Sequence, residues 1–341
     1  MVWYSLYLFQ IRFPLIFLRR LAQTVLILFV VVGCEPAKAG YPRAGFGMST
    51  RADPTTWAER LGAGWFLDWG TRDWGTGKAP EYWQMVRITN GSPRPELDEI
   101  RKIARDHPGM VWVIGNEPDN ALQDNLAAED YALVFHDVSV ALKDEDPSAK
   151  IAMGAVTQPS PLRLEYLDRV LQQYQSRYGE KLPVDWWTVH AYVLREEVNS
   201  WGAGIPVGIV ATSGMLIEPS EHGSLDLFYQ GLVAFRDWMK ERGYQSTPLA
   251  VTEFGILLPP SFGYSPEVVA GYLEGTFQWL DAASDPLTGC PTDEYRLVQR
   301  WAWFSLADET FPVANLVDLD SGQLTPAGEA FRRFTLARAR R

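Results

Sequence analysis

Two glutamates lie where acid–base chemistry at a sugar could take place. Glu117 closes the run Val-Trp-Val-Ile-Gly-Asn-Glu-Pro (111–118), and Glu253 closes the run Leu-Ala-Val-Thr-Glu-Phe-Gly (249–255). Short apolar, β-branched runs that end at turn residues are typical of buried strands, so each carboxylate is expected at the mouth of a strand. A pair of such carboxylates suggests glycoside hydrolysis, in which one protonates the leaving group and the other attacks the sugar.

The composition limits the classes of protein to which these glutamates can belong. The chain has 341 residues, of which 47% are hydrophobic and 21% charged, enough for one large core or two modest ones. A formal net charge of −11 argues against a nucleic-acid partner, because phosphate binding depends on clustered Lys and Arg. The 14 Trp, 14 Tyr and 16 Phe could stack on sugar rings or fill a core.

The N-terminal residues read as an export signal. Arg19 and Arg20 precede the uncharged stretch 21–32, which is long enough for a signal h-region and shorter than the roughly 20 residues that cross a bilayer. The stretch ends Val-Val-Gly-Cys, which resembles a bacterial lipobox and makes Cys34 a candidate lipidation site. The prediction is therefore an exported protein, either a cell-surface lipoprotein or secreted.

The domain boundaries follow from this interpretation. Residues 1–33 are predicted as a lipoprotein-type signal peptide, 34–42 as a tether and 43–341 as one catalytic domain. An ordinary signal peptide cleaved after Ala37 or Ala39, or an uncleaved anchor, remains an alternative. The membrane is expected as a partner only through the lipid, and a monomer is expected.

From residue 44 onward, strand-like and helix-like segments alternate. Strands are predicted at 44–48, 64–69, 84–88, 110–115, 151–156, 185–192, 249–253 and 297–304. Amphipathic helices are predicted at 95–106, 127–142, 161–178, 225–242, 266–282 and 326–339. Eight strand-then-helix units indicate an α/β fold with a single (β/α)₈ TIM barrel. A doubly wound sheet is the competitor, but no Gly-rich phosphate loop follows the first strand.

The barrel gives both glutamates a place. Active sites of such barrels lie at the carboxyl ends of the strands, where Glu117 ends the fourth strand and Glu253 the seventh. The two side chains should therefore face each other across the mouth of the barrel.

The local motifs resemble those of a known clan. Asn116–Glu117–Pro118 and Thr252–Glu253–Phe254–Gly255 resemble the retaining glycosidases built on (β/α)₈ barrels. Together with Val189–His190–Ala191–Tyr192 and Trp303–Phe304, they are most similar to the single-domain glycosyl hydrolase catalytic-core family that includes endo-β-1,3-glucanases. The similarity covers residues 45–334. It implies that Glu117 is the acid/base and Glu253 the nucleophile.

Further residues are predicted to bind substrate. The Asn116 amide could bond a sugar 2-hydroxyl, or simply cap the turn. His190 and Tyr192 lie two apart on one strand, so they share a face, and the phenol could hold the nucleophile ionised. Trp303 could form a platform under the sugar, with Trp301 one layer deeper. Core packing is the alternative for the His, the Tyr and Trp301.

Two more candidates end the second strand. Asp68 and Trp69 are positioned to contact substrate, and relatives more usually have Asn before that Trp, so Asp68 suits a different pattern of hydroxyls. Arg87 is expected at the barrel rim, with an ion pair near the nucleophile as the alternative. The long segment 194–224 is expected to roof the cleft or to form a plain surface hairpin.

The predicted function is a retaining β-glycosidase acting on a polysaccharide or oligosaccharide, with a β-glucan as the expected substrate. A non-catalytic glycan-binding lipoprotein, or a transglycosylase using the same residues, remains an alternative. No metal site is predicted, because His107, His136, His190 and His222 lack ligand spacing. No cofactor is implied.

Overall fold

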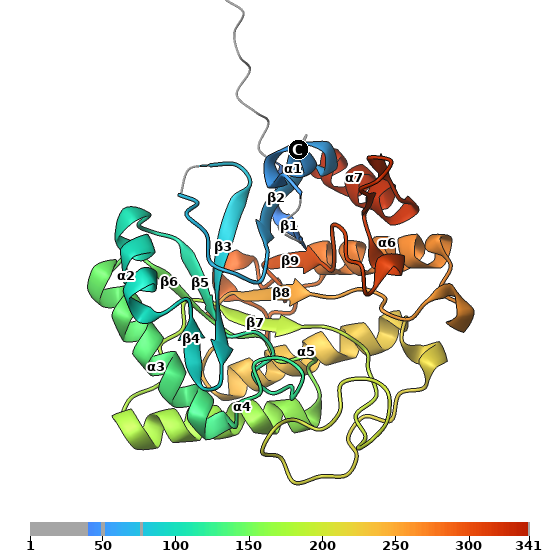
Figure 1. The fold of residues 1–341 in the computed structure, drawn as a ribbon. Helices are drawn as coiled ribbons and strands as arrows, with labels where there is room; N and C mark the ends of the chain where they lie inside the picture. The colour runs from blue at the N-terminus through green and yellow to red at the C-terminus, as the bar shows by residue number, and fades with distance from the viewer. Residues whose placement is uncertain (1–39, 49–51, 76–77, 340–341) are drawn as a thin grey trace, which may run out of the picture. The chain divides into compact units, whose positions relative to one another are not determined.

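Eight parallel strands form the barrel in a computed structural model that describes residues 40–48, 52–75 and 78–339 (Figure 1). These strands are β1 (Tyr41–Gly47), β2 (Ala63–Leu67), β3 (Glu81–Thr89), β5 (Val111–Ile114), β6 (Lys150–Met153), β7 (Trp187–His190), β8 (Leu249–Glu253) and β9 (Arg300–Trp303). They pair in the order β6-β5-β3-β2-β1-β9-β8-β7. Bridges from Ala152 to Trp186 and from Val156 to Val189 join the two ends. The predicted (β/α)₈ barrel is confirmed.

Helices surround the strands (Figure 1). They are α1 (Pro54–Leu61), α2 (Leu97–Asp106), α3 (Ala128–Glu145), α4 (Pro161–Tyr178), α5 (Leu225–Glu241), α6 (Pro266–Ala282) and α7 (Pro326–Arg338). Four of the seven begin at a Ser or Thr whose side chain accepts a backbone N–H bond in the first turn, namely those after Ser160, Ser224, Ser265 and Thr325. A Pro in the first turn of α4, α6 and α7 is already set for helical φ.

Smaller elements decorate the loops. They are β4 (Ser92–Arg94), which pairs antiparallel with β3, the two-stranded ladder of β10 (Val317–Asp318) and β11 (Gln323–Leu324), and the 3₁₀ turns η1 (Pro219–Glu221), η2 (Pro260–Phe262), η3 (Pro291–Asp293) and η4 (Pro312–Ala314).

The core has two layers, as expected for a sheet that is covered on both faces. Inside the barrel, small and large side chains share the space, for example Trp65 and Trp83 beside Ala250 and Ala302. The larger layer lies between the strands and the helices, and Trp301 and Trp303 belong to it. Alternate residues of one strand therefore face opposite layers.

Several details differ from the prediction. α1 was not predicted, and no helix follows β2 within 68–75 and 78–80, so the second unit is a strand followed by a loop. β1 begins at Tyr41, so the last two residues of the predicted tether belong to the barrel. The signal peptide of 1–33 and the lipidation site at Cys34 lie outside the described residues. The described residues fall in one unit, Ala37–Arg341.

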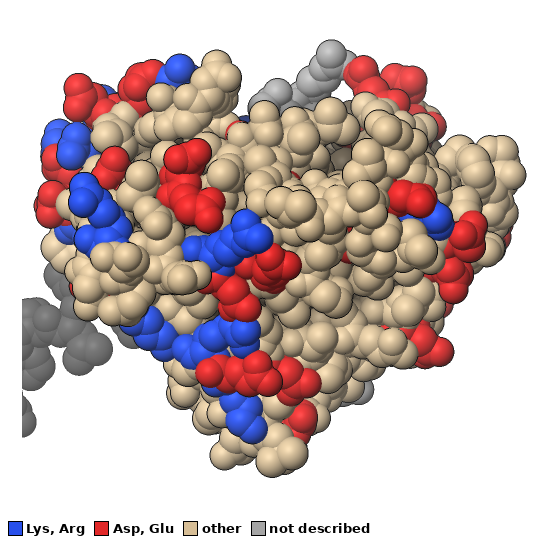
Figure 2. All heavy atoms as spheres, turned by 90° about the horizontal axis from the view of Figure 1, so that it is seen from below, with Lys and Arg blue, Asp and Glu red and all other residues tan. Residues whose placement is uncertain are grey.

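Two observations bear on partners. In the ranges 40–48, 52–75 and 78–339, no helix has both the length and the apolar character needed to span a bilayer. On the face seen in Figure 2, Lys and Arg side chains lie among Asp and Glu side chains instead of forming a region of their own.

Candidate active site

Glu117 lies just beyond β5, in a backbone conformation that few side chains adopt. Its φ is +44°, and Gly115 two residues earlier has a φ of +92°. The left-handed region costs a residue with a Cβ about 1–3 kcal/mol, so neighbouring contacts must hold it. The Glu117 N–H donates to Ala155 O at 2.9 Å, and its carbonyl accepts from Asn120 N at 3.0 Å. The turn aims the carboxylate into the mouth of the barrel.

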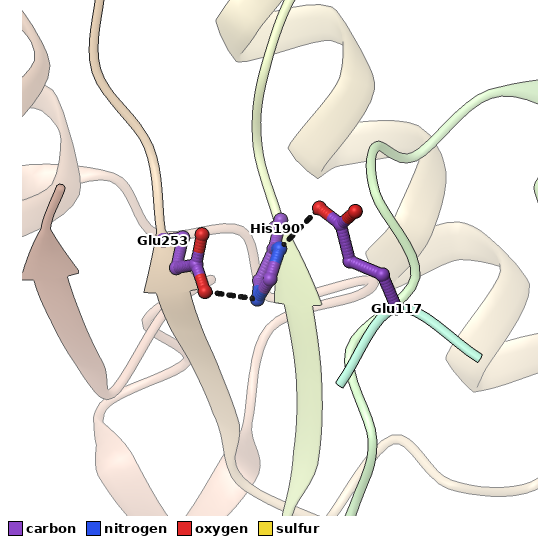
Figure 3. A group of neighbouring side chains, drawn as sticks. All are labelled: Glu117, His190 and Glu253. Atoms are coloured by element: carbon purple, nitrogen blue, oxygen red, sulfur yellow. Dashed lines mark hydrogen bonds and ion pairs between the residues drawn. The ribbon is translucent and has the colours of Figure 1, made fainter. Parts of the chain in front are cut away.

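His190 lies between the two glutamates (Figure 3). Its Nδ1 is 2.8 Å from Glu117 Oε1, and its Nε2 is 3.3 Å from Glu253 Oε1. The second contact has ion-pair distance without the alignment of a hydrogen bond. His190 is fully buried at the end of β7, so strands β5, β7 and β8 together position the three side chains.

The two carboxylates are close enough to act on one sugar. One oxygen of Glu117, one oxygen of Glu253 and a ring nitrogen of His190 all lie within 4.8 Å of one another. Retaining glycosidases place their carboxyl groups about 5 Å apart, and inverting enzymes leave a wider gap for water. Glu117 is 6% and Glu253 5% exposed, so their charges interact in a medium of low dielectric constant.

Each carboxylate also receives donors of its own. The Trp69 indole Nε1–H donates to Glu253 Oε1 at 2.5 Å, and the Tyr192 hydroxyl donates to Oε2 at 3.1 Å. Glu117 Oε2 accepts from the Asn120 amide at 2.7 Å. Hydrogen bonds to an ionised carboxylate favour the charged form.

The pKa values of the three groups move in different directions. Burial raises the pKa of Glu253, and the negative charge of Glu117 adds to this against the opposing effect of His190. Burial alone would also raise the pKa of Glu117, but the hydrogen bond and charge of His190, with help from Asn120, lower it below its usual value. For His190, burial acts to lower the pKa, and the charges of both glutamates outweigh it and raise the pKa.

The same three side chains form the one His and carboxylate group in the described ranges that is compact enough to surround a small cation. The donor set argues for another use. The N–H and O–H groups of Trp69, Tyr192 and Asn120 point at these oxygens, and such donors would compete with a cation for the same lone pairs.

Asp124 fixes the backbone of Asn116 by a hydrogen bond. Asp124 Oδ2 accepts the Asn116 backbone N–H at 2.7 Å, and Asp124 Oδ1 pairs with Arg87 Nε at 2.7 Å. The Asn116 Nδ2 makes a long contact of 3.4 Å to Gln123, and its Oδ1 is buried with no hydrogen-bond partner among the described residues. A buried orphan acceptor beside Glu117 is suited to a ligand hydroxyl. Through its ion pair with Asp124, Arg87 supports the turn that carries Asn116 and Glu117.

A fully buried ion network lies beneath the site. Arg163, at the start of α4, pairs through Nε with Asp119 Oδ2 at 2.7 Å and through Nη1 with Glu196. Burial raises the pKa of Asp119 to about 6, even with Arg163 beside it. The network connects the turn that carries Glu117 to the segment 194–224.

The segment 194–224 forms one wall of the site. Leu194 and Ala203, with Trp201 packed against them, contact Tyr192 and Phe304. The Val207 N–H donates to Asp119 O at 2.8 Å. These contacts place the segment beside Tyr192 on one side of the mouth and beside the turn that carries Glu117 on the other. Of the two expectations for this segment, a roof over the cleft and a plain surface hairpin, they favour a position at the cleft.

Trp303 and Asp68 were predicted to contact substrate, but in the structure their side chains contact other parts of the protein. Trp303 is fully buried between β9 and the helices, and its Nε1 donates to Ala314 O at 2.7 Å, so it cannot be a platform for sugar. The carboxylate of Asp68 is occupied by the Tyr82 hydroxyl and Arg72, so it holds the loop after β2. Asp68 is thus placed to support its neighbour Trp69.

Beside Trp69 and Tyr192, a third ring lies at the site, that of Phe304, which was not predicted from the sequence. It is partly exposed, and its centroid lies 5.6 Å from that of Trp69 and 6.3 Å from that of Tyr192. Asn120 was also missed. The position of Phe304 follows from strand parity only once the structure shows that Ala302, two residues earlier, faces the barrel interior.

A hollow of about 890 Å³ lies beside the mouth, lined by the loop after β9. It offers Asp308, Thr310 and Asp318 but none of the three clustered groups above. The chemistry of the site is therefore assigned to the Glu117, His190 and Glu253 cluster.

Comparisons with solved structures support the barrel fold. A GH128 subgroup II endo-β-1,3-glucanase from Sorangium cellulosum is 18% identical, with a TM-score of 0.56 over 85% of this chain and 97% of its own. A GH128 subgroup I endo-β-1,3-glucanase from Amycolatopsis mediterranei, in complex with laminarihexaose, is 19% identical, with a TM-score of 0.57 over 86% and 99%. A curdlan-specific GH128 subgroup III exo-β-1,3-glucanase from Blastomyces gilchristii gives the same four values.

These neighbours define a class of fold. At this level of identity the likeness is one of architecture, and the neighbours are β-1,3-glucanases, the kind of protein to which the sequence motifs point. No family model matches the sequence, and no curated protein matches it either.

Proposed function

We propose that this protein is a retaining β-glycoside hydrolase that cleaves a β-glucan by double displacement. The observation that carries the proposal is the separation of the two carboxylates, whose nearest oxygens lie within 4.8 Å at the carboxyl ends of β5 and β8. This spacing suits attack by one carboxylate on the anomeric carbon while the other serves the leaving group.

In the first step, ionised Glu253 attacks the anomeric carbon and protonated Glu117 gives its proton to the departing oxygen. The glycosidic bond breaks as the bond between the sugar and Glu253 forms. Asn116 Oδ1 is available to accept a hydrogen bond from a sugar hydroxyl. This hydrogen bond would strengthen as positive charge develops on the sugar ring. The partly exposed ring of Phe304 offers an apolar face to the sugar.

In the second step, Glu117 acts as a base. It takes a proton from water, the resulting hydroxide equivalent attacks the anomeric carbon, and Glu253 leaves as a carboxylate. The hydrogen bonds from Trp69 and Tyr192 stabilise that carboxylate each time it is released.

The assignment of roles rests on the donors around each group. Glu253 receives an indole and a phenol that favour its ionised form, as a nucleophile needs. Glu117 has His190 at 2.8 Å, which gives it a partner for proton exchange. In the free site the charge of His190 keeps the pKa of Glu117 low, so the acid must gain its proton when substrate binds.

The substrate class comes from the structural neighbours. Proteins with this barrel are named as endo- or exo-β-1,3-glucanases, and one is in complex with laminarihexaose. A β-1,3-glucan is therefore the first substrate to test.

The proposal is tested by assaying the protein and its Glu117→Gln and Glu253→Gln variants on a panel of β-glucans. We expect the unmutated protein to release sugar from β-1,3-glucan, and each variant to lose at least about 100-fold in rate, the lower range for a positioned acid–base group. Glu253→Ala in azide should form the inverted glycosyl azide. Glucan binding without release of sugar would instead indicate a non-catalytic binding protein.

Transfer to a sugar acceptor would use the same residues and would be recognised by elongated products. The N-terminal sequence adds a location to the proposal, export with a lipid on Cys34. Labelled palmitate should enter the unmutated protein in a bacterial host and not the Cys34→Ser variant. Equal labelling of both would contradict this location.

A further inference from the structure

The position of His190 constrains the number of protons in the site. A neutral imidazole has one N–H donor and one bare nitrogen, whereas an imidazolium has two donors. Both ring nitrogens of His190 face carboxylate oxygens, at 2.8 Å and 3.3 Å. A bare nitrogen cannot face an ionised carboxylate favourably, because both would present lone pairs.

Three arrangements that hold two protons satisfy this geometry. In the first, His190 is an imidazolium and both glutamates are ionised. In the second, His190 is neutral with its proton on Nε2, and Glu117 is protonated and donates to Nδ1. In the third, His190 is neutral with its proton on Nδ1 and Glu253 is protonated, so this arrangement lacks the ionised carboxylate that attack needs. The first two differ only in whether one proton is on Nδ1 or on Glu117 Oε1, across a contact of 2.8 Å.

Building on the proposed hydrolase function, we propose that His190 stores on Nδ1 the proton that Glu117 delivers to the leaving group. The free site has the first arrangement, and substrate binding produces the second. His190 is then a positioning residue that acts through Glu117.

The step balances without any added reagent. The N–H bond at His190 Nδ1 breaks and an O–H bond forms at Glu117 Oε1, so the imidazolium becomes neutral and the carboxylate becomes an acid. His190 keeps its second proton on Nε2, facing Glu253, which stays ionised for attack. After glycosylation Glu117 is ionised, and the proton that it later takes from water can return to Nδ1.

The surroundings of His190 favour storage of a proton. Glu117 faces it from the end of β5, Glu253 faces it from β8, and the buried carboxyl group of Asp119 adds a further negative charge when it is ionised. The ring of Tyr192 lies 6.1 Å from that of His190, edge to face, and carries no charge. Arg163 pairs with Asp119 and reduces its effect. A sugar above the glutamates would displace water and disfavour separated charges, which moves the proton to Glu117.

The first test observes the proton directly. Nitrogen NMR of the full protein, with ring signals assigned by the His190→Gln variant, should show both nitrogens of His190 protonated at pH 6 in the absence of sugar. In Glu117→Gln the site has one negative charge fewer, so the charged ring should persist only to a lower pH. A neutral ring with a single fixed proton at pH 6 in the unmutated protein would overturn the proposal.

The second test uses the pH dependence of kcat/KM on β-1,3-glucan. The amide of His190→Gln can donate N–H bonds to a carboxylate but cannot take up an additional proton, so this variant separates storage of the proton from hydrogen bonding. Without His190, the proton for the leaving group must be held by a carboxyl group, and the ordinary pKa of a carboxyl group is about two units lower than that of His. We expect the alkaline limb of His190→Gln to move down by about one pH unit or more.

A matched control is His136→Gln, on α3, where the ring stacks on Tyr178 away from the site. It should leave the pH profile unchanged. An alkaline limb in His190→Gln that coincides with the unmutated one would refute storage. If the unmutated protein cleaves no β-glucan, the proposed function fails, and the NMR result still decides where the proton lies.

Discussion

Tyr192→Phe removes one hydrogen bond from Glu253 and keeps the shape of the ring. The Tyr192 hydroxyl donates to Glu253 Oε2 at 3.1 Å, and Oε1 keeps its bond from Trp69 at 2.5 Å. A hydrogen bond to a charged group contributes about 1.5–3 kcal/mol. Since about 1.4 kcal/mol corresponds to a factor of ten in rate, kcat/KM on β-1,3-glucan should fall about 10- to 150-fold.

The same change should move the pH profile. The phenol favours the ionised form of Glu253, so its removal raises the pKa of Glu253 further above its usual value. The nucleophile must be ionised, and the acid limb of kcat/KM should therefore move to higher pH. Initial rates of reducing-sugar release, measured from about pH 4 to 8, would show both the fall in kcat/KM and the shift of its acid limb.

A control variant separates this effect from loss of a buried phenol in general. Tyr244→Phe removes a hydroxyl that donates to Leu182 O at 3.0 Å, outside the site. It should lower the free energy of unfolding by about 1 kcal/mol and leave kcat/KM unchanged. If Tyr192→Phe behaves like this control, with an unmoved acid limb, Tyr192 does not support the nucleophile.

Three further predictions concern the walls and supports of the site. Phe304→Ala should raise KM for β-1,3-glucan about 2- to 12-fold in steady-state kinetics, with a smaller change in kcat, because a stacking face is lost; an unchanged KM would contradict this. His222 accepts the Leu257 N–H at Nε2, and burial lowers its pKa, so the unfolded chain takes up a proton there first and stability falls as pH drops below about 6.5. Urea denaturation of His222→Gln should show a smaller loss between pH 7 and 5, and an equal loss would refute this role. Arg163→Met should cost about 3–5 kcal/mol in urea denaturation because it leaves Asp119 buried without its cation, and a negligible cost would contradict the network.

The strands could be predicted well because their residues are buried on both faces. Continuous apolar runs such as 111–114 and 249–253 are ended by polar or turn residues, and the structure places β5 and β8 there. The helix α1 was missed because it has only eight residues, four of them buried, which is too short for a clear helical period.

The error at Trp303 has a physical cause. A strand that is buried on both sides shows no alternation of polar and apolar residues, so the sequence does not reveal which parity faces the barrel interior. In β9 the interior side is that of Ala302, and Trp303 faces the helices. Phe304, one residue further, therefore reaches the mouth.

Glu117, Glu253 and Tyr192 were predictable because each position depends on the end of a single strand. The bridging geometry of His190 was not, since it depends on the separation of β5 and β8 across β7, which is a property of the closed barrel. The donor from Asn120 depends on the positive φ of Glu117, which no local sequence rule for Glu predicts.

The most direct test of the account is the anomeric configuration of the first product. Proton NMR recorded during the first minutes of β-1,3-glucan hydrolysis, before mutarotation, distinguishes the two anomers of the new reducing end. Double displacement through Glu253 predicts that the β-anomer is formed first. Initial formation of the α-anomer would show a single displacement by water and would contradict the roles given to Glu117 and Glu253.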